Sequence, residues 1–264
     1  MDSETPESDI KTQTARLAAA LIAALESGRD TLPDLPVGRR TRTAATQPSR
    51  SRATGGLDAP PAQPAAQPQA PDEPPLVLPD NLAALREVVA ACERCRLART
   101  RKTTVFGEGP SNPLLMVVGE GAGEAEEECG RPFSGEAGKL LTNILKAMGL
   151  DREKDCYVTT VLKCRVPDDS TPTPDLIGRC RPYLTRQIEL INPRCVMAMG
   201  QTAASVLAGS PSITRLRGKV LKAGDKPLLV TYHPATLLKD PTLKKLVWQD
   251  VQVLMPLIKS EDPK

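Results

Sequence analysis

Short apolar runs alternate along the chain with segments of helical periodicity, and this alternation predicts a parallel sheet covered by helices on both faces. Four apolar runs are expected to form strands, at residues 114–118, 157–162, 195–199 and 228–232. Helices are expected at residues 137–148, from Thr173 onward, at residues 201–207, and from Asp240 to Pro256, which is expected to end the last helix. The predicted fold class is therefore α/β.

The N-terminal part of the chain lacks this alternation. Residues 59–79 are rich in Pro, Ala and Gln and carry too little apolar surface for a core, so residues 1–80 are expected to be a disordered, low-complexity extension. Within it, residues 9–27 have apolar side chains at helical spacing and are followed by Gly28. We expect a short amphipathic helix there, either marginal on its own or docking a protein partner. The folded domain is predicted at residues 81–264.

Composition narrows the class of protein only in part. The chain of 264 residues is 40% hydrophobic, enough for a core, and its formal net charge of +3 is too small to indicate a polyanionic partner by itself. The apolar run at residues 17–25 follows acidic residues and is too short to span a bilayer, so we expect neither a signal peptide nor a membrane partner. Seven cysteines without a secretory leader indicate a reducing compartment, and a cytoplasmic protein is expected.

Four of these cysteines are placed as a metal site requires. Cys92 and Cys95 form a C-E-R-C motif, while Cys164 and Cys180 lie far downstream. Sets of four thiolates hold either a structural zinc ion or an iron–sulfur cluster. The chain contains a single histidine, which nearly excludes mixed Cys/His zinc modules, and the wide gap after Cys95 is unlike that of a compact zinc ribbon. The spacing favours a cluster and leaves zinc as the alternative.

Two of the expected strand ends carry residues suited to chemistry. The first strand leads into Gly119-Glu120-Gly121-Ala122-Gly123, with Glu126 shortly after, and the fourth leads into the only histidine, His233. Ligands of parallel sheets bind beyond the carboxyl ends of the strands, where glycines let them approach the backbone. A binding site at this edge is therefore predicted, although a lone histidine in such a position more often caps a loop.

Seven motifs follow one another in an order and spacing that resemble one family. They are C-x-x-C-x-L at 92–97, V-F-G-E-G-P at 105–110, G-E-G-x-G at 119–123, G-R-P-F-x-G-x-A-G-K-L-L at 130–141, K-C-R at 163–165, L-R-G at 216–218 and T-Y-H-P-A at 231–235. The ordered set is far more specific than any one motif. From about residue 82 to the last helix, the chain resembles the type-4 uracil-DNA glycosylases, the iron–sulfur members of the uracil-DNA glycosylase superfamily.

The resemblance implies a fold and an activity. The fold would be a three-layer α/β/α sandwich around a short, mostly parallel four-stranded sheet, with a 4Fe–4S cluster held by Cys92, Cys95, Cys164 and Cys180. The activity would be that of a monomeric, monofunctional DNA-repair hydrolase. It would break the N-glycosidic bond of uracil in single- or double-stranded DNA and leave an abasic site, after the base has been flipped out of the stack.

Roles for single residues follow from the same resemblance. Phe133 would stack on the extruded base, and His233 with nearby backbone amides would donate hydrogen bonds to its O2, where negative charge develops. Glu120 and Glu126 would stabilise positive charge on the sugar and orient the attacking water. Gly121 would line the substrate site.

Thr160 is the main departure from the family pattern. It stands where the family has an asparagine whose amide reads the uracil edge, and a hydroxyl serves only one of those contacts at a time. Losing a paired contact at a buried edge costs on the order of 1–3 kcal/mol. Discrimination between uracil and cytosine is therefore expected to weaken. Asp168-Asp169-Ser170 also replaces the family's Asn-Arg pair, which removes a cation near the DNA.

Three other functions stay open on these residues. The domain could bind damaged or single-stranded DNA with weak or altered base specificity, it could excise another deaminated base such as hypoxanthine, or it could be a zinc-stapled α/β protein unrelated to DNA. The basic residues expected to contact DNA phosphates are Arg101, Arg215, Arg217 and Lys219. The residues expected to form a solvated acidic rim are Glu124, Glu127 and Glu128.

Overall fold

The computed structural model describes residues 76–167 and 170–259. These residues fall within one compact unit, Ala66–Lys264. The expected helix at residues 9–27 and most of the Pro-rich extension lie outside the described residues. In the part of the chain that is described, no helix is both long and apolar enough to cross a membrane.

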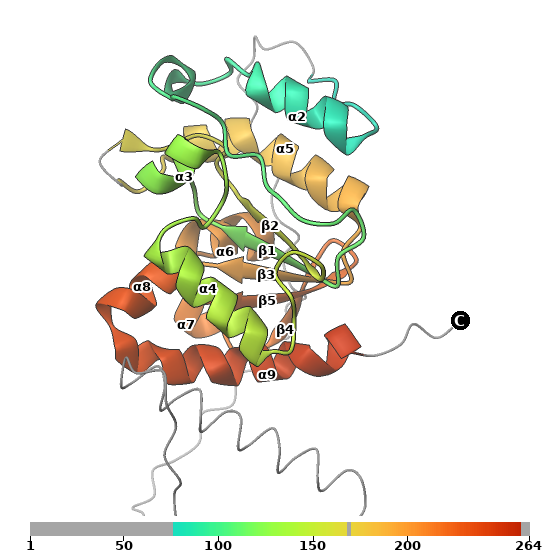
Figure 1. The fold of residues 1–264 in the computed structure, drawn as a ribbon, viewed down its shortest axis with the longest axis vertical. Coiled ribbons are helices and arrows are strands. Elements are labelled where there is room, and N and C mark those ends of the chain that lie inside the picture. The colour runs from blue at the N-terminus through green and yellow to red at the C-terminus, as the bar shows by residue number, and fades with distance from the viewer. Residues whose placement is uncertain (1–75, 168–169, 260–264) are drawn as a thin grey trace, which may run out of the picture. The chain divides into compact units, whose positions relative to one another are not determined.

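A five-stranded sheet forms the centre of the domain (Figure 1). Its strands are β1 (Leu115–Gly119), β2 (Cys156–Thr160), β3 (Cys195–Met199), β4 (Val220–Ala223) and β5 (Lys226–Thr231). In the order β2-β1-β3-β5-β4, the first four run parallel, while β4 pairs antiparallel with β5 at one edge. The predicted α/β class is confirmed, and the four expected strands are the parallel ones.

Helices cover both faces of this sheet. They are α2 (Leu82–Ala90), α3 (Glu124–Cys129), α4 (Glu136–Ala147), α5 (Pro174–Ile191), α6 (Gln201–Ala208), α7 (Ile213–Leu216), α8 (Pro234–Lys239) and α9 (Lys244–Lys259), with the 3-10 helices η1 (Arg96–Arg99) and η3 (Pro241–Leu243). Side chains of α5, α6 and α7 pack with Met116 and Val196 on one face. On the other face α9 packs on β3 and β5, and α4 packs beside α8 (Figure 1). The domain is therefore a three-layer α/β/α sandwich.

The edge strand β4 is not predicted by the sequence pattern. Its side chains alternate between exposed and half-buried, because one face of the edge meets solvent. Gly224, with a φ of 64°, makes the tight turn into β5. Such a short edge strand has no continuous apolar run, so the expected number of four strands is one too few.

Pro256 does not end the last helix, contrary to the expectation. α9 continues to Lys259 with Pro256 inside it. Pro256 is exposed and stands in the last turn, where only a single backbone hydrogen bond is given up. Leu254 and Ile258 on either side of it are buried, so packing keeps the last turn helical.

The strand order sets where a site can form. β1 lies between β2 and β3, so the chain connections on its two sides run in opposite directions. In open parallel sheets, ligands bind beyond the carboxyl ends of the strands where this reversal occurs. β1 ends at Gly119, β3 at Met199 and β5 at Thr231, and the segments after these three strands build the site.

Candidate active site

Two rings are stacked at the carboxyl ends of β1 and β5. The centroids of Phe133 and His233 lie 5.2 Å apart, with an angle of 22° between the ring planes. Gly119 ends β1 against them: a Cβ on Gly119 would lie 2.5 Å from Cζ of Phe133 and 3.5 Å from Nε2 of His233. Only glycine leaves room for the two rings here. We call the space around these three residues the stacked-ring pocket.

His233 is held as a neutral hydrogen-bond donor. It is the N-cap residue of α8, and its Nδ1 accepts a hydrogen bond from the Ala235 N–H at 3.2 Å. Because Nδ1 uses its lone pair, the proton of the neutral ring sits on Nε2, the atom that faces Gly119. Burial lowers the pKa of His233, while the nearby carboxylates of Glu120 and Glu126 oppose this shift. The imidazole is therefore neutral at pH 7.

Glu120 follows β1 directly and reaches toward the start of α6. Its Oε1 accepts a hydrogen bond from the Thr202 N–H at 2.8 Å. Gly200, between β3 and α6, has a φ of 98°, and a Cβ there would lie 2.6 Å from Cδ of Glu120. Within the described residues, Oε2 of Glu120 makes no hydrogen bond. One carboxylate oxygen is therefore fixed and the other is available to a ligand.

Glu126 is placed differently, because both of its carboxylate oxygens are used by the chain. Oε2 accepts from the Gly123 N–H at 3.0 Å, which caps the start of α3. Oε1 accepts from the Ser134 N–H at 2.9 Å and from the Gly135 N–H at 3.4 Å. Glu126 thus joins the glycine-rich turn after β1 to the loop that carries Phe133.

Thr160 ends β2 and has almost no exposed surface. Its hydroxyl donates to the carbonyl oxygen of Leu162 at 2.8 Å, and 1% of the residue is exposed. The hydroxyl proton is therefore already used, and only its acceptor capacity remains for a ligand. Gly121 lies half-buried across from this turn, where a Cβ would make ordinary contact with Leu162 at 3.6 Å.

Lys163 is a buried residue beside the site that the sequence pattern does not predict. Its Nζ donates to Thr159 Oγ1 at 2.7 Å, to the Thr160 carbonyl oxygen at 2.7 Å and to Gln187 Oε1 at 2.5 Å. Burial lowers its pKa to about 7. Its position in the K-C-R motif was the only available signal. Lys163 fixes the end of β2, directly before Cys164.

Four cysteines from three segments of the chain share one region, and we call them the cysteine wall. They are Cys92, Cys95, Cys164 and Cys180. Cys95, Cys164 and Cys180 pack in one apolar cluster that includes Leu97, and Cys92 and Cys180 share the adjoining cluster. Cys92 and Cys95 are close enough to Cys164 to raise the pKa of its thiol, although burial is the larger cause.

Hydrogen-bond donors point at three of these sulfurs. The Tyr183 hydroxyl donates to Sγ of Cys92 at 3.2 Å, the Lys163 N–H to Sγ of Cys180 at 3.4 Å, and the Arg101 guanidinium to Sγ of Cys164 at 3.7 Å. Donors of this kind support metal-bound thiolates, so the donor set fits an anionic sulfur centre. Across residues 76–167 and 170–259, no three His, Cys, Asp or Glu side chains are grouped as a single metal ion requires.

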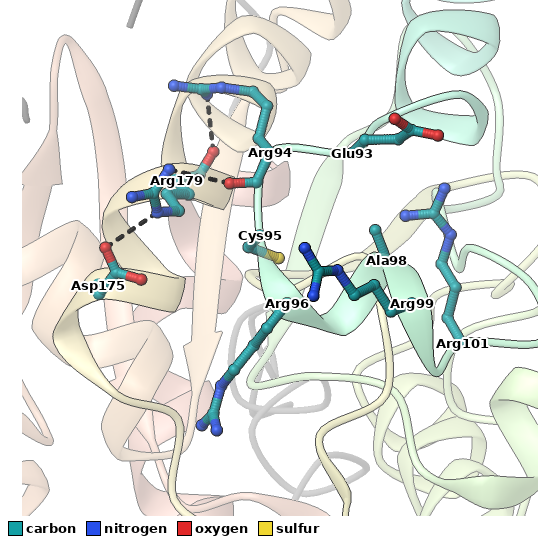
Figure 2. A pocket seen from close by; sticks show the side chains of 9 residues that line it. All are labelled: Glu93, Arg94, Cys95, Arg96, Ala98, Arg99, Arg101, Asp175 and Arg179. Atoms are coloured by element: carbon teal, nitrogen blue, oxygen red, sulfur yellow. Dashed lines mark hydrogen bonds and ion pairs between the residues drawn. The ribbon is translucent and has the colours of Figure 1, made fainter. Parts of the chain in front are cut away.

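A basic cavity of about 720 Å³ opens beside the cysteine wall (Figure 2). We call it the arginine pocket; its lining residues are Glu93, Arg94, Cys95, Arg96, Ala98, Arg99, Arg101, Asp175 and Arg179. Arg96 and Arg99 on η1 are exposed. Arg101 instead turns inward, donating to the carbonyl oxygens of Cys92 at 2.6 Å and Ala90 at 2.9 Å. Arg101 therefore braces the loop, and Arg96 and Arg99 provide the accessible charge.

The three basic residues expected around the L-R-G motif do not behave alike. Arg215 and Lys219 are exposed. Arg217 donates to Oδ2 of the buried Asp250 at 3.2 Å and to the Leu246 carbonyl oxygen at 2.8 Å. Asp250 also accepts from the Thr231 hydroxyl at 2.7 Å. Arg217 is thus bound to α9, Asp250 links α9 to the end of β5, and the Arg217 guanidinium is committed to the protein.

Comparison with known proteins identifies the family. The sequence pattern of the Uracil DNA glycosylase superfamily matches residues 106–252. The chain is 41% identical over 180 residues to a type-4 uracil-DNA glycosylase of Thermotoga maritima, covering 66% of this chain and 93% of that protein. It is 39% identical over 188 residues to one of Sulfurisphaera tokodaii, covering 67% and 85%. This chain belongs to the uracil-DNA glycosylase superfamily.

Within the superfamily, the chain is more similar to the type-4 members than to a type-5 member. A type-5 uracil-DNA glycosylase of Pyrobaculum aerophilum is 29% identical over 148 residues, covering 49% of this chain and 64% of that protein. The matched residues 106–252 contain the whole stacked-ring pocket, with Cys164 and Cys180, and leave out Cys92 and Cys95. The likeness to type-4 members extends over more of the chain, in agreement with the resemblance predicted from the motifs.

The expectation that Glu127 belongs to a solvated acidic rim is wrong, because only 4% of this residue is exposed. Its carboxylate accepts from the Lys102 N–H at 3.1 Å and lies 3.8 Å from Nη1 of Arg165. Glu124 and Glu128 are exposed as expected. The acidic run forms α3, and Glu127 is the buried residue of this helix.

Proposed function

We propose that this chain is a monofunctional uracil-DNA glycosylase, which hydrolyses the N-glycosidic bond of uracil in DNA and leaves an abasic site. The observation that carries this proposal is the stack of Phe133 on His233 against Gly119. Membership of the superfamily and the type-4 relatives support the substrate class. A flat ring beside a neutral N–H donor suits a planar base that leaves as an anion.

The base reaches the pocket only after it has been flipped out of the stack. Phe133 then offers a ring on which the base rests. His233 donates its Nε2–H to O2 of the departing uracil, where negative charge grows as the bond breaks. The Ala235 N–H holds the ring from behind, so little reorganisation is needed at that moment.

Glu120 is the carboxylate that orients the attacking water. Its Oε1 is fixed by the Thr202 N–H, and its Oε2 is available to accept a proton of the water. Its negative charge also favours the positive charge that develops on the sugar. Glu126 serves as a positioning residue, because both of its oxygens hold backbone N–H groups.

Thr160 supports uracil over cytosine through one contact. Its proton is donated to Leu162, so the hydroxyl oxygen accepts. N3 of uracil carries a hydrogen and can donate to it, whereas N3 of cytosine is an acceptor and cannot. The amide donor that would bind O4 is absent, so recognition rests on one hydrogen bond instead of two.

The cysteine wall would hold a 4Fe–4S cluster, with Cys92, Cys95, Cys164 and Cys180 as ligands. The donors at three of the sulfurs support this assignment, and zinc is the lesser alternative. When bound, the cluster would link η1, the K-C-R segment and α5 as a structural brace. Broad absorbance near about 400 nm distinguishes the cluster from zinc.

DNA is the partner implied by this chemistry. The arginine pocket and the exposed Arg215 and Lys219 supply positive charge for phosphates. A second candidate function, a DNA-binding protein with weak base specificity, is favoured by one observation. Thr160 is 1% exposed, so a base reaches it only if neighbouring side chains move.

An excision assay tests the proposal. Protein purified without oxygen is incubated with matched oligonucleotides containing uracil, hypoxanthine or cytosine, in single and double strands, and released bases are measured. Release of free uracil with little release of cytosine is expected, and it should vanish in His233→Ala. Binding of every oligonucleotide without release of any base would instead support the DNA-binding function.

A further inference from the structure

The loop that presents Phe133 is held in an unusual conformation. Phe133 has a φ of 51°, in the left-handed region that bulky side chains rarely adopt. Such a residue costs on the order of 1–3 kcal/mol and persists only where its surroundings impose it. The loop also lies tightly on α4, since a Cβ on Gly138 would be 1.7 Å from the carbonyl oxygen of Phe133. Some part of the chain must impose this geometry.

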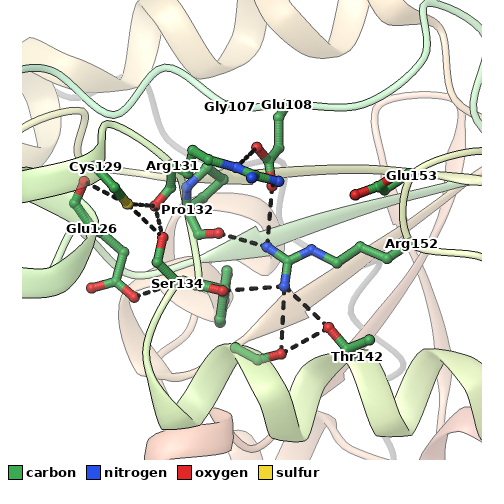
Figure 3. Close-up of polar contacts among 12 residues, drawn as sticks. Gly107, Glu108, Glu126, Cys129, Arg131, Pro132, Ser134, Thr142, Arg152 and Glu153 are labelled. Atoms are coloured by element: carbon green, nitrogen blue, oxygen red, sulfur yellow. Dashed lines mark hydrogen bonds and ion pairs between the residues drawn. The ribbon is translucent and has the colours of Figure 1, made fainter.

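Arg152 holds the backbone of this loop next to Phe133 (Figure 3). Its guanidinium donates to the carbonyl oxygens of Pro132 at 2.6 Å and Phe133 at 3.1 Å. It also donates to the Gly138 carbonyl oxygen at 3.4 Å and to Thr142 Oγ1 at 3.2 Å, both on α4. One planar group therefore binds the strained peptide on both sides and fastens it to the helix.

Glu108 connects the Arg152 guanidinium to the sheet. Its Oε1 lies 3.3 Å from Nη2 of Arg152. Its backbone pairs with Val158 of β2 in both directions, at 3.0 Å and 2.8 Å. The other oxygen of Glu108 accepts from Nε of Arg131 at 2.6 Å, but Arg131 is exposed and touches no atom of Phe133 through its guanidinium. Glu108 thus links the position of Arg152 to the sheet.

We propose that Arg152 is a positioning residue, which keeps the Phe133 ring stacked on His233 and so keeps the base platform aligned with the Nε2–H donor. The role of this stack in holding a flipped base rests on the proposed function, whereas the alignment of the two rings is a property of the structure alone. Arg152 stands outside every motif that resembles the family, and three of its acceptors are backbone carbonyls, which any sequence supplies.

Arginine is required at this place for a geometric reason. The guanidinium presents five N–H donors in a fixed fork. Its two terminal nitrogens contact five acceptor oxygens, which belong to Glu108, Pro132, Phe133, Gly138 and Thr142. A lysine ammonium has three donors at a single point and reaches only part of the set. Arg152→Lys should therefore release the loop partly, and Arg152→Ala should release it fully.

The single histidine of the chain gives a direct readout. On protein without a histidine tag, the imidazole of His233 yields one set of NMR signals, shifted by the ring current of Phe133 at 5.2 Å. Phe133→Ala defines the position without that ring. We expect Arg152→Ala to move the His233 signals most of the way to this position, Arg152→Lys to move them part of the way, and Arg131→Ala to leave them unchanged.

Kinetics supply the second readout. A displaced platform should lower kcat for uracil release by about tenfold to a hundredfold, with KM for the oligonucleotide within about twofold of wild type. If Arg152→Ala does not fold, Arg152→Lys carries the same test. Wild-type His233 signals in a folded Arg152 variant would overturn the inference. Shifted signals with no uracil release by any form, wild type included, would instead overturn the proposed function and leave the inference standing.

Discussion

The stacked-ring pocket and the cysteine wall are neighbouring parts of one domain, and they are completed in different ways. In the pocket, Nδ1 of His233, Oε1 of Glu120 and both oxygens of Glu126 are already bound by backbone N–H groups. In the wall, donors point at three of the four thiols, and the four thiols make no bond to one another. The chain thus builds the pocket by itself, whereas under the proposed function a bound cluster would join the thiols of the wall. Changes in the pocket should alter rate, and changes in the wall should alter stability and DNA affinity.

Removing a wall ligand should have the largest effect. Cys180→Ser should abolish the broad absorbance near about 400 nm and lower the melting temperature by roughly 10 °C or more, because several segments lose a shared link. Absorbance, iron content and thermal unfolding measure this. Cys129→Ser, at an exposed thiol, is the matched control and should keep both colour and stability. A coloured, stable Cys180→Ser protein would remove Cys180 from the ligand set.

Acidification should affect the pocket next. Burial holds the pKa of folded His233 below its usual value. As the pH falls below about 6.5, the unfolded chain takes up this proton before the folded one does, so the stability contribution of neutral His233 is lost with decreasing pH. Once protonated, Nδ1 no longer accepts from Ala235, and the ring loses its orientation.

The rate of uracil release should also fall as the pH decreases. Single-turnover uracil release is expected to fall by about tenfold per pH unit below the folded pKa of His233, with little change between about pH 7 and 8. Cluster absorbance recorded over the same range is the control, since it reports the wall. A rate that stays level while the NMR signals of His233 show that the ring takes up its proton would mean that neutral His233 is not needed.

Sequence reasoning succeeded where a pattern is imposed by burial. β3 was predicted with its observed bounds, Cys195–Met199, because a parallel strand covered on both faces must be apolar throughout. The ends of β1 and β5 drew attention because glycines and the lone histidine stand there. The motifs then supplied the family. These are signals that single segments carry by themselves.

The rest depends on contacts between distant segments. The stack of Phe133 on His233 brings two loops together, and the sequence of neither loop indicates that it contacts the other. In the sequence, Arg152 looks like an ordinary surface charge, because three of its acceptors are backbone carbonyls. Glu127 was read as solvated because a run of glutamates gives no sign of which one turns inward. Three-dimensional placement decides all of these.

Restoring the family residue at the end of β2 sharpens the comparison inside the pocket. Thr160→Asn should raise the rate of uracil release by about five- to tenfold, since the amide adds a donor for O4 worth about 1 kcal/mol. Stability and cluster absorbance should not rise with it. Thr214→Asn on exposed α7 is the control. If neither wild type nor Thr160→Asn releases uracil while both bind DNA, the domain is a binding protein.

Neutralising the arginine pocket should have the smallest effect, and this effect should be on DNA binding instead of on rate or stability. Each phosphate contact that is lost should reduce the steepness of the plot of log K against log salt concentration by about 0.7–0.9. Together, Arg96→Ala and Arg99→Ala remove two expected phosphate contacts, so the plot should become less steep by nearly twice this amount. The rate of uracil release from saturated complexes should stay unchanged. Binding is measured by titration between about 50 and 200 mM salt. Lys139→Ala, at an exposed cation of α4, is the control and should leave the slope as it is. An unchanged slope in the double variant would mean that the DNA does not pass along the cysteine wall, and that the wall contributes stability alone.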